Sequence, residues 1–217
     1  MSYREQNKAF RKQLISEAAF QLLSDKPFEL VSVDEIAAQL GCGKGTIYRY
    51  FENKDHLLNE LVASGLRTLC QDMEERCVQN DDTIQALTNY ITLQYHYFRK
   101  YNTILSSWSR RKLEQAIRLE WVAEIQTLLD SKVQMLVAIL DRGLENKIIA
   151  PVDSLELARL LENIVRDATF PFVEAQPRPR DPNRVLDLMT SIFMNGIKNK
   201  VEDATEHEGG SPIDKKH

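Results

Sequence analysis

The chain has 217 residues, of which 43% are hydrophobic and 28% are charged, and 28 Lys and Arg against 32 Asp and Glu give a net charge of −4. This apolar fraction is enough for a buried core, while eight glycines, seven prolines and three cysteines are too few for a turn-rich all-β protein or a disulfide framework. The longest apolar run, Met135 to Leu140, is far shorter than the roughly 20 residues that span a bilayer, and the N-terminus is polar. We therefore expect a cytoplasmic protein with no membrane segment.

The first predicted element is a helix over about residues 3–25. Apolar residues from Phe10 to Leu23 recur at spacings of three and four, which places them on one helical face. The helix ends before Pro27, because a proline in a helix interior costs about 3 kcal/mol. Its first half is basic, with four cations against one anion: Arg4, Lys8, Arg11 and Lys12 against Glu5.

Two short helices joined by a glycine-containing turn follow. Ser32 and Glu35 have the spacing of a capping box, in which each side chain pairs with a free backbone amide near the other. The helix that they open ends at residues 41–43, and helical spacing resumes over residues 44–51. Asn53 is a candidate cap for a further helix. This order of elements is the helix-turn-helix pattern.

The rest of the chain has helical periodicity and no strand-like alternation of useful length, so we predict an all-α fold. The predicted helices cover residues 83–100, 103–109, 112–146, 153–174 and 182–201, and residues 202–217 are expected to be a disordered tail.

The stretch from Val31 to Leu61 resembles the DNA-binding signature of the TetR/AcrR family of bacterial transcriptional regulators. The matching residues are Ser32-Val33, Ile36-Ala37, Leu40-Gly41, Lys44 through Phe51, Lys54, Leu57 and Leu58. The resemblance covers about the first 65 residues, and beyond them only the length and the helical pattern agree with the family. It implies a helix-turn-helix DNA-binding domain of three helices over residues 1–55, followed by a helical effector-binding and dimerisation domain over residues 56–201.

The residues of the second short helix suit contact with DNA. Ile47 and Phe51 take the inner face, which leaves a face of hydroxyl, phenol and cationic groups for a major groove. Gly45 allows close approach to a sugar-phosphate backbone. Taken one at a time, however, these are ordinary surface cations or core aromatics. The resemblance implies that Lys44, Thr46 and Tyr48 face the groove and that Ser32, Tyr50 and Lys54 anchor phosphates, while Arg49 varies in the family and has a fork suited to guanine.

The predicted C-terminal domain carries aromatic and polar residues that suit an effector cavity, although most of the aromatics are also explained as core. The candidate pocket residues are Tyr90, Gln94, Tyr97, Trp108, Trp121, Asn163, Asp167 and Phe170. The last two long helices are apolar on more than one side, and the resemblance implies that they pair with their copies in a homodimer. The candidate interface residues are Leu157, Leu161, Ile164, Leu188, Ile192 and Phe193.

These observations predict a regulator, most simply a repressor, that binds a double-stranded DNA operator as a dimer and is released by a small-molecule effector. The alternative is an architectural or partner-recruiting DNA-binding module without an effector. No nucleophile elbow, P-loop, HExxH or paired CxxC motif is present, so we expect no enzyme, no cofactor and no metal site. Residues 1–55 hold eight cations and eight anions, and the acidic excess therefore belongs to the predicted sensor domain.

Overall fold

The computed structural model describes residues 2–169 and 182–198, and throughout these ranges the regular elements are helical apart from one bridge between Ile149 and Lys198. The predicted all-α fold is confirmed. The helices are α1 (Tyr3–Asp25), the 3-10 turn η1 (Phe28–Leu30), α2 (Val33–Gln39), α3 (Lys44–Tyr48), α4 (Lys54–Met73), the π-helical turn η2 (Glu74–Val78), α5 (Thr83–Leu113), α6 (Leu119–Glu145), α7 (Ser154–Thr169) and α8 (Pro182–Ile197). None of the helices described combines the length and apolarity needed to cross a membrane.

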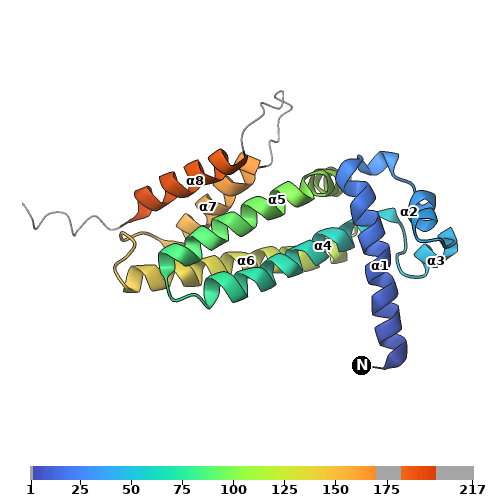
Figure 1. Ribbon diagram of the computed structural model, residues 1–217, viewed down its shortest axis with the longest axis horizontal. Coiled ribbons are helices and arrows are strands. Elements are labelled where there is room, and N and C mark those ends of the chain that lie inside the picture. The colour runs from blue at the N-terminus through green and yellow to red at the C-terminus, as the bar shows by residue number, and fades with distance from the viewer. Residues whose placement is uncertain (1, 170–181, 199–217) are drawn as a thin grey trace, which may run out of the picture.

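The molecule is elongated, with a small head of α1–α3 at one end and the long helices of the body at the other (Figure 1). The head has its own buried centre, to which each of its helices contributes. Ile15 and Leu23 of α1, Ile36 of α2 and Ile47 of α3 are nearly inaccessible to solvent. Burial of one such side chain contributes about 1.5–3 kcal/mol, which accounts for the stability of short helices that would not persist alone.

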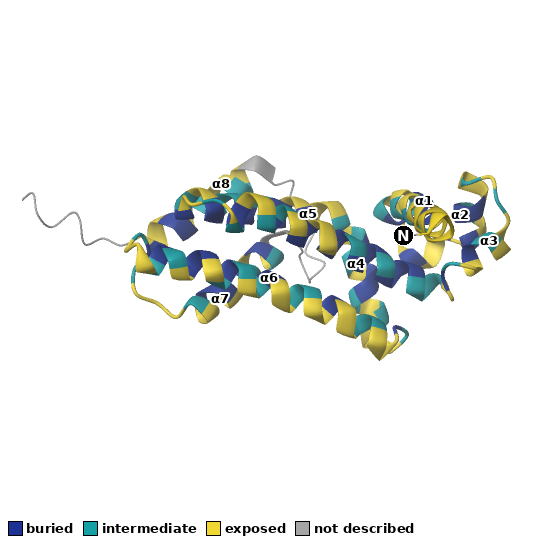
Figure 2. Cartoon of the chain, turned by 90° about the horizontal axis from the view of Figure 1, so that it is seen from below, coloured by how far each residue is buried: buried dark blue, intermediate teal, exposed yellow. Residues whose placement is uncertain are grey.

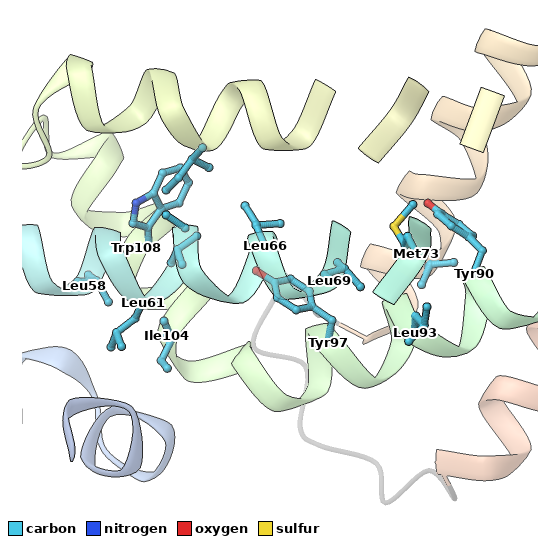
Figure 3. Packing of buried hydrophobic residues seen from close by; sticks show 14 of the residues in the cluster. Leu58, Leu61, Leu66, Leu69, Met73, Tyr90, Leu93, Tyr97, Ile104 and Trp108 are labelled. Atoms are coloured by element: carbon cyan, nitrogen blue, oxygen red, sulfur yellow. The ribbon is translucent and has the colours of Figure 1, made fainter. Parts of the chain in front are cut away.

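Helix α4 runs from the head into the body and belongs to both cores. Asn53 caps its N-terminus by accepting a 2.7 Å hydrogen bond from the His56 amide, as predicted. Buried side chains of α4 pack into the body along the length of the helix, from Leu58 near the head to Leu69 and Met73 at the far end (Figure 3), where α4 contacts both α5 and α6. Because one rigid helix spans the junction, a displacement of α4 in the body is also felt by the head.

The predicted break at Tyr101 and Asn102 is wrong, because α5 continues through both residues. The helix is continuous from Thr83 to Leu113, since Tyr101 stacks on Tyr97 with ring centroids 4.8 Å apart and continues the same buried face. The true break comes at residues 114–118, within the predicted helix 112–146, where Gln115 adopts a positive φ of 56°. The basic run that starts at Arg110 therefore ends a helix instead of starting one.

The last two helices pack on the body at the side opposite α4. Helices α7 and α8 both contact α5, and α7 also contacts α6. Helix α7 starts close to the predicted residue 153, with Asp153 accepting a 2.8 Å hydrogen bond from the Glu156 amide. The predicted extension of α7 to residue 174 and the predicted tail 202–217 lie outside the described residues.

Candidate DNA-binding site and effector domain

The turn between α2 and α3 is built by local hydrogen bonds and one glycine. The predicted capping box is present, with the Ser32 amide 2.7 Å from the Glu35 carboxylate and the Glu35 amide 3.1 Å from the Ser32 hydroxyl. Hydrogen bonds from Ser32 lower the pKa of the Glu35 carboxyl. At the other end of α2, Gly41 has a φ of 61°, which residues with a side chain rarely adopt. The chain therefore reverses where the sequence predicts.

Helix α3 has an exposed face with polar side chains and a buried apolar face. Ile47 is 1% exposed, whereas Lys44, Tyr48 and Arg49 are exposed and Thr46 is half-buried. A side chain placed on Gly45 would meet no atom of the protein within 4 Å. The protein's own packing therefore does not require a glycine at this position. Figure 2 shows α3 at one end of the molecule, and the predicted groove-facing residues of this helix, Lys44, Thr46 and Tyr48, are exposed or half-buried.

Two predicted DNA-contacting residues already have partners within the head. Lys44 Nζ lies 3.0 Å from Asp34 Oδ2, and this hydrogen bond raises the pKa of Lys44. The pair is exposed and of small value to stability, so a phosphate can replace Asp34 at little cost. The Ser32 hydroxyl accepts the capping bond from the Glu35 amide, so Ser32 is engaged with Glu35 within the head.

Lys54 is more enclosed than its predicted role suggests. Its ammonium group donates to the Phe28 carbonyl oxygen and lies 4.0 Å from the centroid of the Phe28 ring. Burial lowers the pKa of Lys54. The Phe28 carbonyl uses one N–H of the ammonium group, which has three N–H donors in all. Tyr50, the third predicted phosphate anchor, is half-buried beside the end of α3.

Helix α3 is shorter than predicted. It covers Lys44–Tyr48, with Arg49 as its C-cap and Tyr50 in the following turn, whereas helical spacing in the sequence continues to Phe51. Phe51 is 1% exposed and belongs to the core, which explains its place in the apolar pattern. Gly43 is the N-cap of α3 and, having no side chain, forms no side-chain cap.

A buried polar cluster joins three helices of the body. Lys132 of α6 is 1% exposed, and its Nζ lies 2.5 Å from Glu162 Oε2 of α7 and 3.2 Å from Gln94 Oε1 of α5. The Tyr90 hydroxyl also donates to the Glu162 carboxylate. Burial and the charge of Glu162 hold the pKa of Tyr90 well above its ordinary value, so the phenol stays a donor. We call these four residues the buried polar cluster.

The predicted effector-pocket residues are only partly brought together. Tyr90, Gln94 and Tyr97 lie inside the body (Figure 3), where Tyr97 is 7% exposed and its hydroxyl has no hydrogen-bond partner. Burial raises the pKa of Tyr97, so this unpaired hydroxyl is protonated. Asn163 and Asp167 differ from the prediction, because both are exposed on the outer surface of α7. Phe170 lies outside the described residues.

Trp108 and Trp121 occupy the junction of head and body. The Trp108 indole donates a 3.0 Å hydrogen bond to Asn59 Oδ1, and Trp121 stacks on His56 with centroids 4.4 Å apart. Nearby, Arg111 makes two hydrogen bonds of 2.7 and 2.8 Å to Asp55. These contacts fix the end of α5 and the start of α6 against α4. The two tryptophans are therefore better placed to couple the domains than to bind an effector.

The predicted dimer residues divide between two environments. Leu157, Leu161 and Phe193 are at most 9% exposed within the single chain, so they belong to its own core and cannot form a free interface. Ile164 of α7 is 44% exposed, and Leu188 and Ile192 of α8 are 58% and 65% exposed. Leu160, which the prediction did not include, is 54% exposed one turn before Ile164.

Lys132 and Glu162 are the main residues that the sequence analysis missed. They lie 30 residues apart on different helices, and each looks like one of many surface charges in the sequence. The only sequence signal is the position of Lys132 four residues before Leu136 in an otherwise apolar helical face. Across the residues described there is no group of three His, Cys, Asp or Glu side chains able to hold a metal ion.

A three-helix head with a polar outer face, joined by α4 to a larger helical body, defines the class of helix-turn-helix DNA-binding regulators. The sequence model of the family described as bacterial regulatory proteins, tetR family, matches residues 15–61. The resemblance to the TetR family of transcriptional regulators is therefore confirmed over the helix-turn-helix region, residues 15–61.

Individual relatives match the chain to different extents. The transcriptional regulator YhgD of Bacillus subtilis (strain 168) is 35% identical over 65 residues, which are 30% of this chain and only 34% of that protein. The fatty acid metabolism regulator protein of the same organism is 24% identical over 186 residues, covering 86% of this chain and 95% of that protein. These relatives are regulators and not enzymes, in agreement with the prediction.

The fold of most of the chain is also found in solved structures. The transcriptional regulator FadR from Bacillus subtilis, in complex with stearoyl-CoA, aligns with a TM-score of 0.68 at 22% identity, covering 85% of this chain and 98% of that one. The likeness extends beyond the head to the body, and the predicted arrangement of a helix-turn-helix domain followed by a helical domain is confirmed at the level of the fold.

Proposed function

We propose that the protein is a homodimeric cytoplasmic repressor that binds a pseudo-palindromic DNA operator and is released from it by a small-molecule effector. The observation that carries the DNA-binding part is the outer face of α3, where exposed Lys44, Tyr48 and Arg49 flank a glycine with open space above it. A helix of this size enters a major groove, and such side chains contact bases and phosphates there.

Within this proposal the contacts are divided by the chemistry of each side chain. Lys44, Thr46 and Tyr48 face the groove, and the planar fork of Arg49 reads a guanine. Ser32, Tyr50 and Lys54 hold phosphates on either side of α3. Phosphate contacts position the head, whereas base contacts select the sequence. Residues 1–55 form the DNA-binding domain and residues 56–201 the effector and dimerisation domain.

The test is a gel shift with duplexes selected by the protein from a random library. We expect Lys54→Ala to weaken binding to all duplexes alike and to lower the slope of log K against log salt by about 0.9 for each phosphate that is no longer neutralised. Arg49→Ala should instead change the preferred base and reduce discrimination between bases by about 1–3 kcal/mol. The matched control is Arg76→Ala, which removes an exposed cation at the far end of the body. Failure of the wild type to select any sequence would contradict the function.

The effector site is proposed for the interior of the body beside Tyr97. A buried hydroxyl without a partner costs about 1–3 kcal/mol, which a ligand acceptor would offset. The cleft that Tyr97 lines holds about 160 Å³, less than ligand sites usually offer, so binding requires α4 and α5 to separate there. This separation would move α4 and change the spacing of the two heads, and the effector would act by preferring that form.

A long-chain acyl-CoA is the first effector to test, because a relative that matches 86% of this chain is a fatty acid metabolism regulator. Thermal unfolding with acyl-CoAs of increasing chain length measures binding, and free CoA is the control, since only ligands of the native state raise stability. Release of DNA by the same compounds supports the repressor. A protein that binds DNA but no compound in a wide screen would instead be the architectural module.

A further inference from the structure

The first half of α1 extends beyond the core of the head. The first buried residue of α1 is Ile15, and residues 2–11 are all exposed, including Tyr3 at 80% and Phe10 at 58%. Figure 1 shows this half projecting past α2 and α3 toward the N-terminus. A helical extension of this kind buries almost no apolar surface, so the stability of the head does not explain it.

A cleft lies between this extension and the end of α3. It holds about 320 Å³ and is lined by Tyr3, Arg4, Asn7, Lys8, Arg11 and Tyr50. Tyr50 is one of the phosphate anchors of the proposed DNA-binding site, so the cleft adjoins that site directly. Its other walls contribute three cations, an amide and a phenol, all of which donate hydrogen bonds to phosphate oxygens.

The three cations are placed for an external anion. Arg4, Lys8 and Arg11 follow each other at spacings of four and three and therefore share one face of α1. None of them forms an ion pair with any residue that the structure describes, whereas neighbouring Lys12 pairs with Glu60 at 2.7 Å. Arg4 also lies in the first turn, where the helix dipole disfavours a cation by about 0.3–1 kcal/mol. This arrangement does not stabilise the fold, but it would stabilise a bound polyanion.

We propose that this basic arm, Arg4, Lys8 and Arg11 on the first half of α1, is a second DNA-binding element that holds phosphates flanking the half-site contacted by α3. The inference rests on the proposed function. At 1.5 Å per residue, Arg4 and Arg11 are about 10 Å apart along the helix, which suits contact with more than one phosphate. The arm lengthens the DNA footprint and raises affinity without changing the preferred sequence, because phosphates carry no base information.

The test combines a change in the arm with a change in the DNA. The double variant Lys8→Gln/Arg11→Gln is compared with Arg76→Gln/Arg99→Gln, which removes two exposed cations from the body. Each protein is titrated onto two duplexes, both carrying a sequence that the wild type selects from a random library. One duplex ends at the selected sequence, and the other has six additional base pairs on each side.

We expect the arm variant to bind the long duplex about tenfold or more weakly than the wild type, with a salt slope lower by up to about 2 per protomer. On the short duplex the arm variant and the wild type should bind equally, and the body variant should match the wild type on both. If all proteins bound the long duplex equally, or if the arm variant were weakened equally on both duplexes, the proposed role of the basic arm would be wrong. Neither result would contradict the proposed function as a DNA-binding regulator. Failure of the wild type to bind either duplex would overturn both.

Discussion

At the scale of single residues, two positions of the head carry glycine for different physical reasons. Gly41 adopts a φ of 61°, a conformation that costs other residues about 1–2 kcal/mol. Gly45 lies within α3 in ordinary helical conformation with open space around it. The first glycine therefore serves the fold, and the second serves the proposed approach of DNA.

These reasons predict different outcomes for the two alanine variants. Gly45→Ala should keep or raise stability, by up to about 1 kcal/mol, because alanine is the better helix former, and should weaken DNA binding. Gly41→Ala should lower stability by about 1–2 kcal/mol. Denaturant unfolding and gel shifts on the same proteins separate the effects. If Gly45→Ala bound DNA as tightly as the wild type, close approach at this position would be wrong.

The three cysteines differ in burial, and their reactivity should differ accordingly. Cys42 is half-buried in the turn of the head, whereas Cys70 and Cys77 are buried in the body. Burial raises the pKa of Cys70, and it raises the pKa of Cys77 to about 11. At pH 8 only about one in a thousand Cys77 side chains is then a thiolate, the form that reacts.

We therefore expect one thiol to react quickly with an aromatic disulfide reagent in the native protein, and three after unfolding. Cys42→Ser should abolish the fast phase, while Cys77→Ser should leave it unchanged. Two or more fast thiols in the native state would contradict the burial of the body cysteines. The sequence does not reveal the burial of each thiol, and only the packing distinguishes Cys42 from the other two.

At the scale of helices, local sequence signals predict where a helix starts better than they predict whether it continues without a break. Ser32, Asn53 and Asp82 all cap helices, because a cap depends on residues within one turn. The continuity of α5 through Tyr101 instead depends on contacts with Tyr97 and with Phe20 of α1, whose ring centroid lies 5.1 Å from that of Tyr101. Contacts between distant segments are invisible to periodicity, and the predicted break there was wrong for that reason.

The sequence does not reveal the buried polar cluster for the same reason, because its residues come from distant segments. The cluster allows a specific prediction of stability. Lys132→Met removes the cation and leaves the Glu162 carboxylate with the hydrogen bonds from Tyr90 and Gln94 but no counter-charge, which should cost about 3–5 kcal/mol of unfolding free energy. Adding Glu162→Gln keeps an acceptor for Tyr90 and removes the unpaired charge. The double variant Lys132→Met/Glu162→Gln should therefore be more stable than Lys132→Met alone.

Chemical denaturation of the wild type, both single variants and the double variant completes a thermodynamic cycle. A coupling of about 1 kcal/mol or more between the two positions supports an ion pair that holds α7 to α6. Additive effects would mean that the two side chains act independently of each other. Because α7 carries part of the exposed apolar surface, a loosened cluster should also weaken any assembly that forms through that surface.

At the scale of the molecule, exposed apolar residues are concentrated on the side of the body formed by α7 and α8. Leu160 and Ile164 are one turn apart on α7, as are Leu188 and Ile192 on α8, and all four are at least 44% exposed. A monomer would leave this surface in water at a cost of about 25 cal/mol for each Å². A second copy of the chain would cover it, which is the dimer of the proposed function.

The dimer and the DNA-binding head can be tested together. Leu188→Glu places a charge in the proposed interface and should give a monomer in analytical ultracentrifugation, with a folded helical content unchanged. Leu119→Glu is the matched control, since Leu119 is 86% exposed at the start of α6, outside the apolar surface of α7 and α8. A monomer presents one head, so it should bind a full operator no more tightly than a half-site.

The charge distribution explains why loss of the dimer should be so severe for DNA binding. Residues 1–55 hold equal numbers of cations and anions, so one head gains little from long-range attraction to DNA. Its affinity comes from local contacts, and joining two heads makes the second binding event intramolecular. We expect the Leu188→Glu protein to bind the operator at least about a hundredfold more weakly than the wild type. A monomer that still binds the full operator like the wild type would show that α7 and α8 have another use.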